Sequence, residues 1–404
     1  MSIFYLIFIG LCLYFCYRYD GIEEYDSHKQ HRLWMMCVYM ILLTGFSYGL
    51  GGDKFVYMKE FQSYPGSFSE AEDFIWLNFM MKGQMPLWTL TNLTCKVLFD
   101  SFYAVQLLES AAINIAVCFL VSKYTHRFFL FLLIYFFSLQ YFIFNTEIMR
   151  EGFAMSFALV GMHFFMTSRR WVFFTLLPFA ILFHISATTA LLFPFIRFKI
   201  TPISLLYALL ISFSIWVFSD LVLGKVMMGV LGGMGAIVQK VLFYSIQAST
   251  IFGFLRSVLT YLVFPFIIAY TSMYYEPSDE IKKYKEKLLS FLILLGILAS
   301  SFAGFVRLFN YIQIFYLIML ADYFYLLFRI KEHLIIRIGT MIGTIFLITL
   351  TYFIHYKSTN TYYYDYFYPY TCILNETDDV FIREIAHFEA TNIEESDKNV
   401  RNIE

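Results

Sequence analysis

Residues 145–195 read NTEIMREGFAMSFALVGMHFFMTSRRWVFFTLLPFAILFHISATTALLFPF, an apolar tract with a carboxylate–arginine cluster at one end and a histidine near the middle. An apolar stretch of this kind predicts membrane-spanning helices. A charged side chain inside hydrocarbon costs roughly 3 kcal/mol on insertion scales, so it needs a partner, a water-filled cavity or an anionic ligand. Arg150 and His184 are therefore candidate functional residues.

The composition of the whole chain indicates a polytopic membrane protein. Its 404 residues are 60% hydrophobic, 21% aromatic and only 15% charged, against roughly 50% apolar and 25% charged residues in soluble domains. The formal net charge of −1 argues against nucleic-acid binding, which needs a concentrated basic surface. The scattered histidines and cysteines show no metal-ligand spacing, so we expect no metal site.

The apolar segments predict an all-α protein with about twelve transmembrane helices, most of them about 15 to 23 residues long. The predicted spans are 2–17, 33–50, 102–121, 128–145, 146–166, 171–186, 187–198, 202–219, 255–273, 288–304, 306–328 and 334–355.

The predicted domain organisation is a multi-span transmembrane domain, 1–355, followed by a short polar tail, 356–404. We expect the last part of the tail to be disordered. Two outer loops, 51–101 and 220–254, interrupt the spans. The first is too polar to span the bilayer, and we expect it to include an interfacial amphipathic helix.

Basic residues determine the predicted orientation. Placing Arg18, Lys29 and Arg32 in the cytoplasm leaves the N-terminus outside the cell, and the later loops on the same side are also basic. The Lys282–Lys287 run is interpreted as a solvated cytoplasmic loop, and the tail is then outside the cell.

The segments 171–186 and 187–198 are short, and they contain Pro178 and Pro194. Broken helices are tolerated in a membrane where they line a cavity. We therefore expect two half-helices that meet in the outer leaflet, with His184 at their junction.

With this topology, ionisable side chains from distant parts of the chain converge on the outer side: Asp53, Arg150, His184, Arg256 and Arg307. An anionic lipid headgroup explains cations on that side, because arginine forks bind phosphate bidentately and a helix N-terminus adds its positive end. His163 lies about 20 Å of helical rise and roughly 140° from Arg150. We interpret His163 as a buried histidine bonded to a neighbouring span.

Four short patterns follow one another on the predicted outer side. The first comprises Phe46, Tyr48, Gly51, Asp53, Tyr57 and Phe61; the second Arg150, Glu151, Gly152 and Ala154; the third Phe183, His184, Ser186 and Ala187; the fourth Arg307 and Tyr311. At these positions the sequence resembles the EpsG family of Wzy-like polysaccharide polymerases, from about Tyr48 to Tyr311. Two positions depart from the family patterns, with Ser47 replacing an arginine and Glu151 replacing a glutamine.

The resemblance implies a GT-C-like membrane glycosyltransferase in a bacterial cytoplasmic (inner) membrane. Such a polymerase transfers undecaprenyl-diphosphate-linked oligosaccharide repeat units at the outer face, building exopolysaccharide, capsule or O-antigen chains. The expected partners are the lipid-linked oligosaccharide, a chain-length regulator and a flippase of the same pathway. No cofactor beyond the lipid-linked substrate is expected.

In the implied reaction a sugar hydroxyl attacks an anomeric carbon and the lipid diphosphate leaves. Arg150 and Arg307 suit stabilisation of the departing negative charge, which is worth about 3 kcal/mol per donor. Asp53 and His184 are both candidates for the general base, a role worth roughly 10² to 10⁴-fold in rate.

Aromatic and basic residues near these positions are candidates for substrate binding, since an aromatic face packs against sugar C–H surface. They are Tyr57, Trp76, Trp88, Arg256 and Tyr311.

Each assignment has a structural alternative. The arginines can snorkel to headgroups, Asp53 can cap a turn, and His184 can be a satisfied structural histidine. The tryptophans and tyrosines can belong to an interfacial belt.

Three other functions remain open. A lipid-linked oligosaccharide flippase needs charges at mid-span, whereas these lie at predicted outer ends. An O-antigen ligase shares the donor chemistry and differs in its acceptor. An acyltransferase that decorates the polysaccharide is the third.

Overall fold

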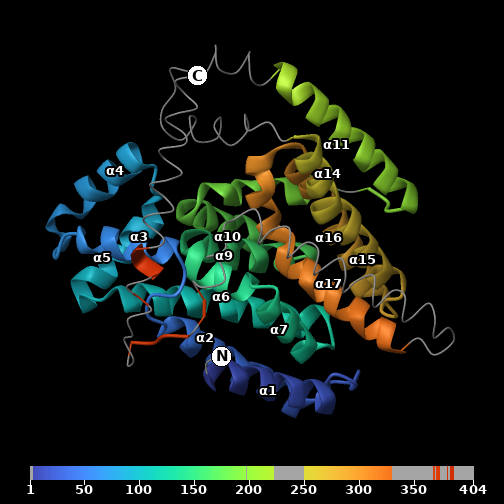
Figure 1. The fold of residues 1–404 in the computed structure, drawn as a ribbon, viewed down its shortest axis with the longest axis horizontal. Coiled ribbons are helices and arrows are strands. Elements are labelled where there is room, and N and C mark those ends of the chain that lie inside the picture. The colour runs from blue at the N-terminus through green and yellow to red at the C-terminus, as the bar shows by residue number, and fades with distance from the viewer. Residues whose placement is uncertain are drawn as a thin grey trace.

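A computed structural model describes residues 3–196, 198–222 and 250–329, with tail pieces at 367–368, 370–373, 380 and 383–385. The described residues are helical (Figure 1), which confirms the all-α prediction for this part of the chain. The predictions for most of the loop 220–254, for the span 334–355 and for most of the tail lie outside the described residues.

The elements follow in chain order. They are α1 (Ile3–Tyr19), α2 (Ser27–Gly45), α3 (Asp53–Gln62), η1 (Phe68–Glu70), α4 (Ala71–Lys82), α5 (Pro86–Phe99), α6 (Phe102–Tyr124), α7 (Phe128–Phe137), α8 (Gln140–Phe142), η2 (Ile143–Glu147), α9 (Met149–Met166), α10 (Arg170–Phe183), η3 (Ile185–Phe195), α11 (Pro202–Val222), α14 (Ile251–Val258), η5 (Leu259–Val263), α15 (Phe264–Tyr274), α16 (Asp279–Ser301), η6 (Ala303–Phe309) and α17 (Asn310–Arg329).

Within the described residues, three helical stretches are long and apolar enough to cross a membrane: Phe102–Tyr124, Ile251–Tyr274 and Gly304–Leu327. The pair Phe128–Phe137 and Gln140–Glu147 passes the same test together, but it is bent by 81°. Shorter apolar helices include α1, α10 and η3. The membrane class is therefore supported, while the number of twelve spans stays a prediction.

Helix α9 lies near the centre of the fold, with α6 on one side and α10 on another (Figure 1). Gly152 permits this approach. A Cβ on Gly152 would lie 2.3 Å from a carboxylate oxygen of Glu109 on α6 and 2.7 Å from the carbonyl oxygen of Phe144. Only a residue without a side chain fits between these two oxygen atoms.

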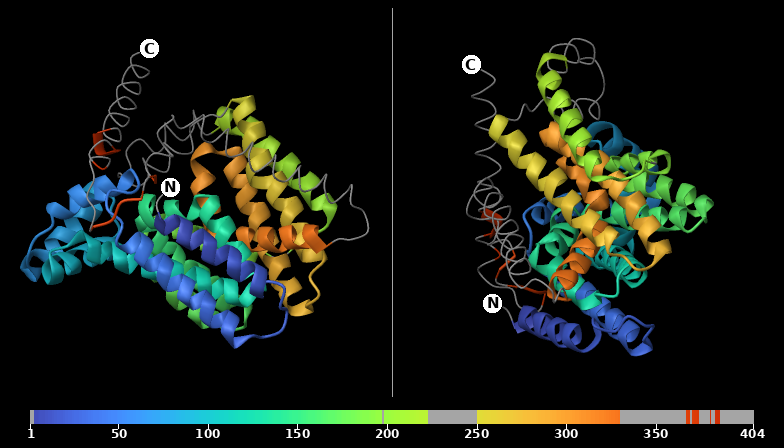
Figure 2. Two further views of the ribbon diagram at one scale, coloured as in Figure 1. Left: turned by 60° about the horizontal axis from the view of Figure 1, so that its bottom comes forward. Right: turned by 90° about the vertical axis from the view of Figure 1, so that its right-hand side faces the viewer.

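The loop 51–101 forms α3, α4 and α5, which project to one side of the helical body (Figure 2). The predicted interfacial helix falls in this region. Helix α4 exposes several large apolar side chains, namely Trp76, Leu77, Met80 and Met81. That these side chains meet a bilayer surface stays a prediction.

The described pieces of the tail pack against the same end of the bundle as the start of α1. The Tyr5 hydroxyl donates to the Phe367 carbonyl at 3.0 Å. The backbone of Ser47 pairs with that of Cys372. These described pieces of the tail therefore lie at the end where α1 begins and α2 ends. That this end is outside the cell stays a prediction.

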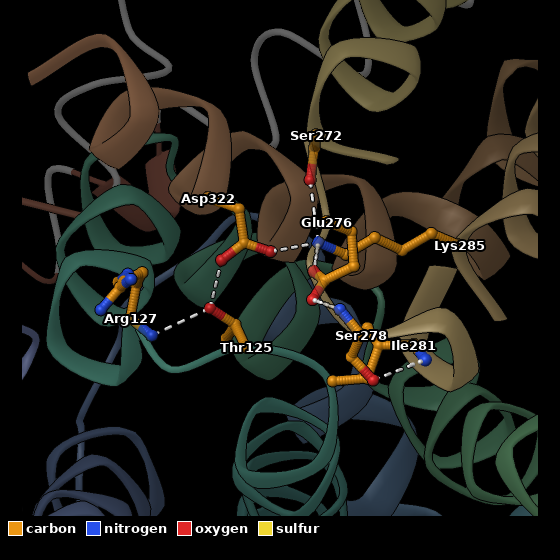
Figure 3. A network of polar contacts seen from close by, with 8 residues as sticks. All are labelled: Thr125, Arg127, Ser272, Glu276, Ser278, Ile281, Lys285 and Asp322. Carbon is orange, nitrogen blue, oxygen red and sulfur yellow. Dashed lines mark hydrogen bonds and ion pairs between the residues drawn. The ribbon is translucent and has the colours of Figure 1, made fainter. Parts of the chain in front are cut away.

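The opposite end of the bundle holds a buried ionic network (Figure 3). Lys285 is 1% exposed, and its Nζ lies 2.6 Å from Glu276 and 2.7 Å from Asp322. It also donates to the Ser272 hydroxyl at 3.0 Å. The interpretation of Lys282–Lys287 as a solvated loop is wrong, because the run lies in α16. Lys285 is buried against Asp322 of α17 and against Glu276 of the turn between α15 and α16.

A second set of contacts at this end joins the α1–α2 turn to α7. The Asp20 carboxylate accepts the backbone N–H groups of Phe129 at 3.1 Å and Leu130 at 2.8 Å. Burial raises the pKa of Asp20 to about 6. The Arg127 guanidinium lies 3.4 Å from the ring centre of Tyr325. We call the two sets of contacts together the basic-end network.

Candidate active site

The candidate site surrounds the first turn of α9, where α3, η2, η3, η6 and α17 approach one another. The chain enters α9 through η2, a short π-helical segment with i→i+5 hydrogen bonds. Such segments are frequent at functional sites, because the extra residue per turn shifts side chains off the regular helical positions.

Helix α3 is seated on η2 by the carboxylate of Glu147. One oxygen accepts the backbone N–H of Gly52 at 2.6 Å, and the other accepts that of Asp53 at 3.1 Å. The Tyr57 hydroxyl, one turn further along α3, donates to the Glu147 carbonyl at 3.3 Å. Gly51 has φ of +88°, a left-handed conformation that glycine adopts without strain. These contacts place Asp53 and Tyr57 beside the start of α9.

Arg150 lies over the face of Tyr57, with its Cζ 5.1 Å from the ring centre. Asp53 and Glu60 also attract its charge. Burial raises the pKa of Tyr57 to about 12 despite the opposing effect of Arg150. Tyr57 therefore stays protonated near neutral pH and can donate a hydrogen bond.

Lys54 brings a second cation close to this group. Its Nζ donates to the backbone carbonyl and to the hydroxyl of Ser47, both at 3.0 Å. Burial lowers the pKa of Lys54 to about 7, although Glu109 and Glu147 act in the opposite direction. At Ser47, where the sequence departs from the family pattern, a buried ammonium group supplies a positive charge.

His184 lies between α10 and η3 in an extended conformation, with φ −154° and ψ 130°. This confirms the predicted break between two short helices at this residue. The His184 Nδ1 lies 2.6 Å from the Ser186 hydroxyl, which lies 2.9 Å from the hydroxyl of Tyr311. The ring is thus oriented by a relay that ends on α17.

Glu151 connects α9 to the other side of the site. Its carboxylate accepts the Asn310 side-chain amide at 3.2 Å, and it interacts electrostatically with Arg307 and Tyr311. Arg307 itself is exposed on η6. Arg150 and Glu151, adjacent in sequence, therefore serve two groups on different sides of α9.

Aromatic rings form the packing between the two groups. Phe153 stacks on Phe183 with ring centres 4.7 Å apart, and Trp88 lies 6.3 Å from Phe153. The ring of Trp88 also meets Tyr57 edge-on at 5.4 Å. The structure thus brings six of the predicted site residues around the start of α9: Asp53, Tyr57, Arg150, His184, Arg307 and Tyr311.

The other three predicted residues have different surroundings. Trp88 is 1% exposed, so a sugar would reach its ring only if Tyr57 or Phe153 moved. Trp76 is 63% exposed on α4, where it lines a shallow hollow of about 450 Å³. Arg256 is half-buried on α14, whose main helix neighbours are α16, η5 and α11.

His163, which the sequence separated from the site, is a structural residue. It is 8% exposed, and its Nδ1 lies 2.9 Å from the hydroxyl of Tyr124 on α6. The prediction of a buried histidine bonded to a neighbouring helix is confirmed.

Within the ranges that the structure describes, no group of three or more His, Cys, Asp or Glu side chains could hold a metal ion. The cations placed around the start of α9 are Arg150, Arg307 and Lys54.

Sequence reasoning assigned no role to Glu147 or Lys54. A signal was present for both: Glu147 is an ionisable residue at the end of an apolar tract, three residues before Arg150, and Lys54 is adjacent to Asp53. Their partners could not be read from the sequence, because Glu147 bonds Gly52 and Asp53 across more than ninety positions.

No curated protein and no solved structure matches the chain. The EpsG family matches residues 32–372, a range that includes the whole site around α9. Because this match covers most of the chain, the protein belongs to the EpsG family, a family of Wzy-like polysaccharide polymerases.

Proposed function

We propose that this protein transfers undecaprenyl-diphosphate-linked oligosaccharide repeat units at the outer face of the cytoplasmic membrane, building exopolysaccharide, capsule or O-antigen chains. The observation that supports this most is the gathering of Asp53, Arg150, His184 and Arg307 from four distant parts of the chain. Family membership supports a polymerase activity in polysaccharide synthesis.

In the proposed reaction, a hydroxyl oxygen of the acceptor sugar forms a bond to the anomeric carbon of the donor. The bond between that carbon and the lipid diphosphate breaks, and the diphosphate leaves with the electron pair. Arg150 on one side of α9 and Arg307 on the other are the cations available to the diphosphate, and a fixed cation stabilises the charge that develops in the transition state. The proton of the acceptor hydroxyl goes to the general base.

The hydrogen-bond relay favours His184 as this base. The Ser186 backbone N–H donates to the His184 Nδ1 at 3.4 Å, the Ser186 hydroxyl lies 2.6 Å from the same atom, and Tyr311 holds that hydroxyl. The imidazole is thus fixed in one orientation, as a positioned base must be. Asp53 is then the anion beside Arg150 that keeps the guanidinium in place. A chain-length regulator and a flippase are the proposed partners.

The test is extension by the purified protein in proteoliposomes, with a lipid-diphosphate-linked repeat unit as the only sugar source. We expect products that grow in repeat-sized steps, without nucleotide sugar and in the presence of a chelator. Accumulation of single repeat units, or a requirement for nucleotide sugar, would refute the polymerase function. Transfer of a single unit to a different lipid acceptor would indicate a ligase.

A further inference from the structure

We propose that Lys54 is a positioning residue: its buried ammonium group and the Glu147 carboxylate together fix the first turn of α3, and so hold Asp53 and Tyr57 against Arg150. This inference rests on the proposed function, because α3 matters to catalysis only if Asp53 and Arg150 belong to the active site.

Lys54 is attached to a residue just beyond the end of α2. Lys54 is 0% exposed, and its two 3.0 Å hydrogen bonds both go to Ser47. The Gln106 amide of α6 also donates to the Ser47 carbonyl at 3.0 Å, and the Ser47 hydroxyl donates to the Thr44 carbonyl at 2.8 Å. Lys54 thus joins the start of α3 to a fixed point between α2 and α6.

Two carboxylates surround the ammonium group of Lys54. Glu109 faces it from α6 and Glu147 from η2, and both stabilise its charged form. Among the described residues, neither carboxylate oxygen of Glu109 has a hydrogen-bond partner. A buried carboxylate in this setting depends on a nearby cation, because removal of one member of a buried charge pair leaves the other uncompensated.

Glu147 and Lys54 both act on the first turn of α3, which carries Asp53. Glu147 binds the first free N–H groups of α3, a favourable place for an anion because of the unpaired donors and the helix dipole. Lys54 is the residue next to Asp53, and Tyr57 is one turn beyond. The same turn of α3 is therefore held by Glu147 from one side and by Lys54 from another.

The charge of Lys54, and with it the rate of polymerisation, should depend on pH. Burial lowers the pKa of Lys54 to about 7, against the effects of Glu109 and Glu147. The ammonium form is present below this pH and is lost as the pH rises through it. We therefore expect polymerisation by the wild type to decline above about pH 7.

The experiment compares Lys54→Met, Lys54→Arg and the control Lys59→Met, which changes an exposed lysine on the same helix. Lys54→Met should reduce kcat on the order of 10²-fold, as expected for a displaced catalytic constellation, and should also weaken binding of the lipid-linked donor, because Asp53 then no longer holds Arg150. Lys54→Arg should retain part of the activity and should shift the alkaline decline to higher pH, because guanidinium stays charged. Lys59→Met should behave as the wild type.

Hydrogen exchange of residues 47–57 provides a readout that does not depend on activity. Lys54→Met should accelerate exchange at the amides of Gly52 and Asp53, which Glu147 protects. Wild-type exchange and wild-type kcat in Lys54→Met would overturn the proposal, as would an unshifted alkaline decline in Lys54→Arg. If the wild type fails to extend the lipid-linked unit, the proposed function fails, and exchange still decides the role of Lys54.

Discussion

Arg150 lies in the first turn of α9, beside side chains of α3. An arginine at the end of an apolar helix can also snorkel to lipid headgroups, with no role in catalysis. The structure adds its neighbours: the guanidinium lies 5.1 Å over the Tyr57 ring and near Asp53 and Glu60. These partners are far away in sequence, so no local pattern could identify them.

Replacement of Arg150 by alanine should abolish polymer while the protein still inserts, with a loss of about 3 kcal/mol of transition-state stabilisation, or about 10²-fold in kcat. Arg150→Lys should recover little, because an ammonium group lacks the bidentate fork. Polymer length on gels and protein in membranes are measured together, with the exposed Arg169→Ala as the control. Wild-type polymer length in Arg150→Ala would show that Arg150 only snorkels to the headgroups and takes no part in catalysis.

His184→Ala and Asp53→Asn distinguish the two candidate bases. We expect His184→Ala to lose turnover, by roughly 10² to 10⁴-fold, while binding of the lipid-linked donor is retained. Asp53→Asn should instead weaken donor binding, since it alters the group that holds Arg150. Rates and donor affinity are measured on purified protein. Full turnover in His184→Ala, with loss of turnover in Asp53→Asn, would exchange the two roles.

At the scale of helices, the apolar pattern predicted α6 and α9 to within a few residues, and the break at His184 followed from proline and segment length. The predicted span 128–145 was less accurate, because the chain bends by 81° after Phe137. Leu139 has φ of +60° there, and leucine gives no sequence signal for a left-handed conformation. The loop 51–101 forms α3, α4 and α5, and the position of α3 depends on Glu147, which is distant in sequence.

Gly152→Ala tests the close approach of α9 to α6. The added methyl group would meet the Glu109 carboxylate and the Phe144 carbonyl, and overpacking of this kind costs about 1–3 kcal/mol. Gly10→Ala on α1 is the matched control, because nothing lies within 4 Å of its Cβ position. Thermal unfolding in detergent should show a lower melting temperature for Gly152→Ala only. Equal melting temperatures would show that α9 can shift without cost.

At the scale of the whole molecule, the bundle has two polar ends of different character. The site end holds Arg150, the start of α1 and the described tail pieces, whereas the other end holds the basic-end network. Loop charges alone predicted this separation. They did not predict the burial of Lys285, because Asp322 lies 37 residues away on another helix.

Lys285→Met should destabilise the protein by about 3–5 kcal/mol, since it leaves the half-buried carboxylates of Glu276 and Asp322 without their cation. Lys283→Met, which changes an exposed lysine on the same helix, should have little effect. Denaturant or thermal unfolding measures both variants. A triple variant that also carries Glu276→Gln and Asp322→Asn should regain part of the loss. No difference between the two lysine variants would contradict the ionic role of Lys285.

The most direct measurement is the sidedness of these two ends in intact cells. Lys59→Cys on α3 and Lys283→Cys on α16 place thiols at exposed positions near the site and near the basic-end network, in a background where the half-buried Cys16 and Cys372 are serine. We predict that a membrane-impermeant maleimide labels Lys59→Cys in intact cells and Lys283→Cys only after permeabilisation. The reverse pattern would put the site around Arg150 on the cytoplasmic side and would contradict polymerisation at the outer face.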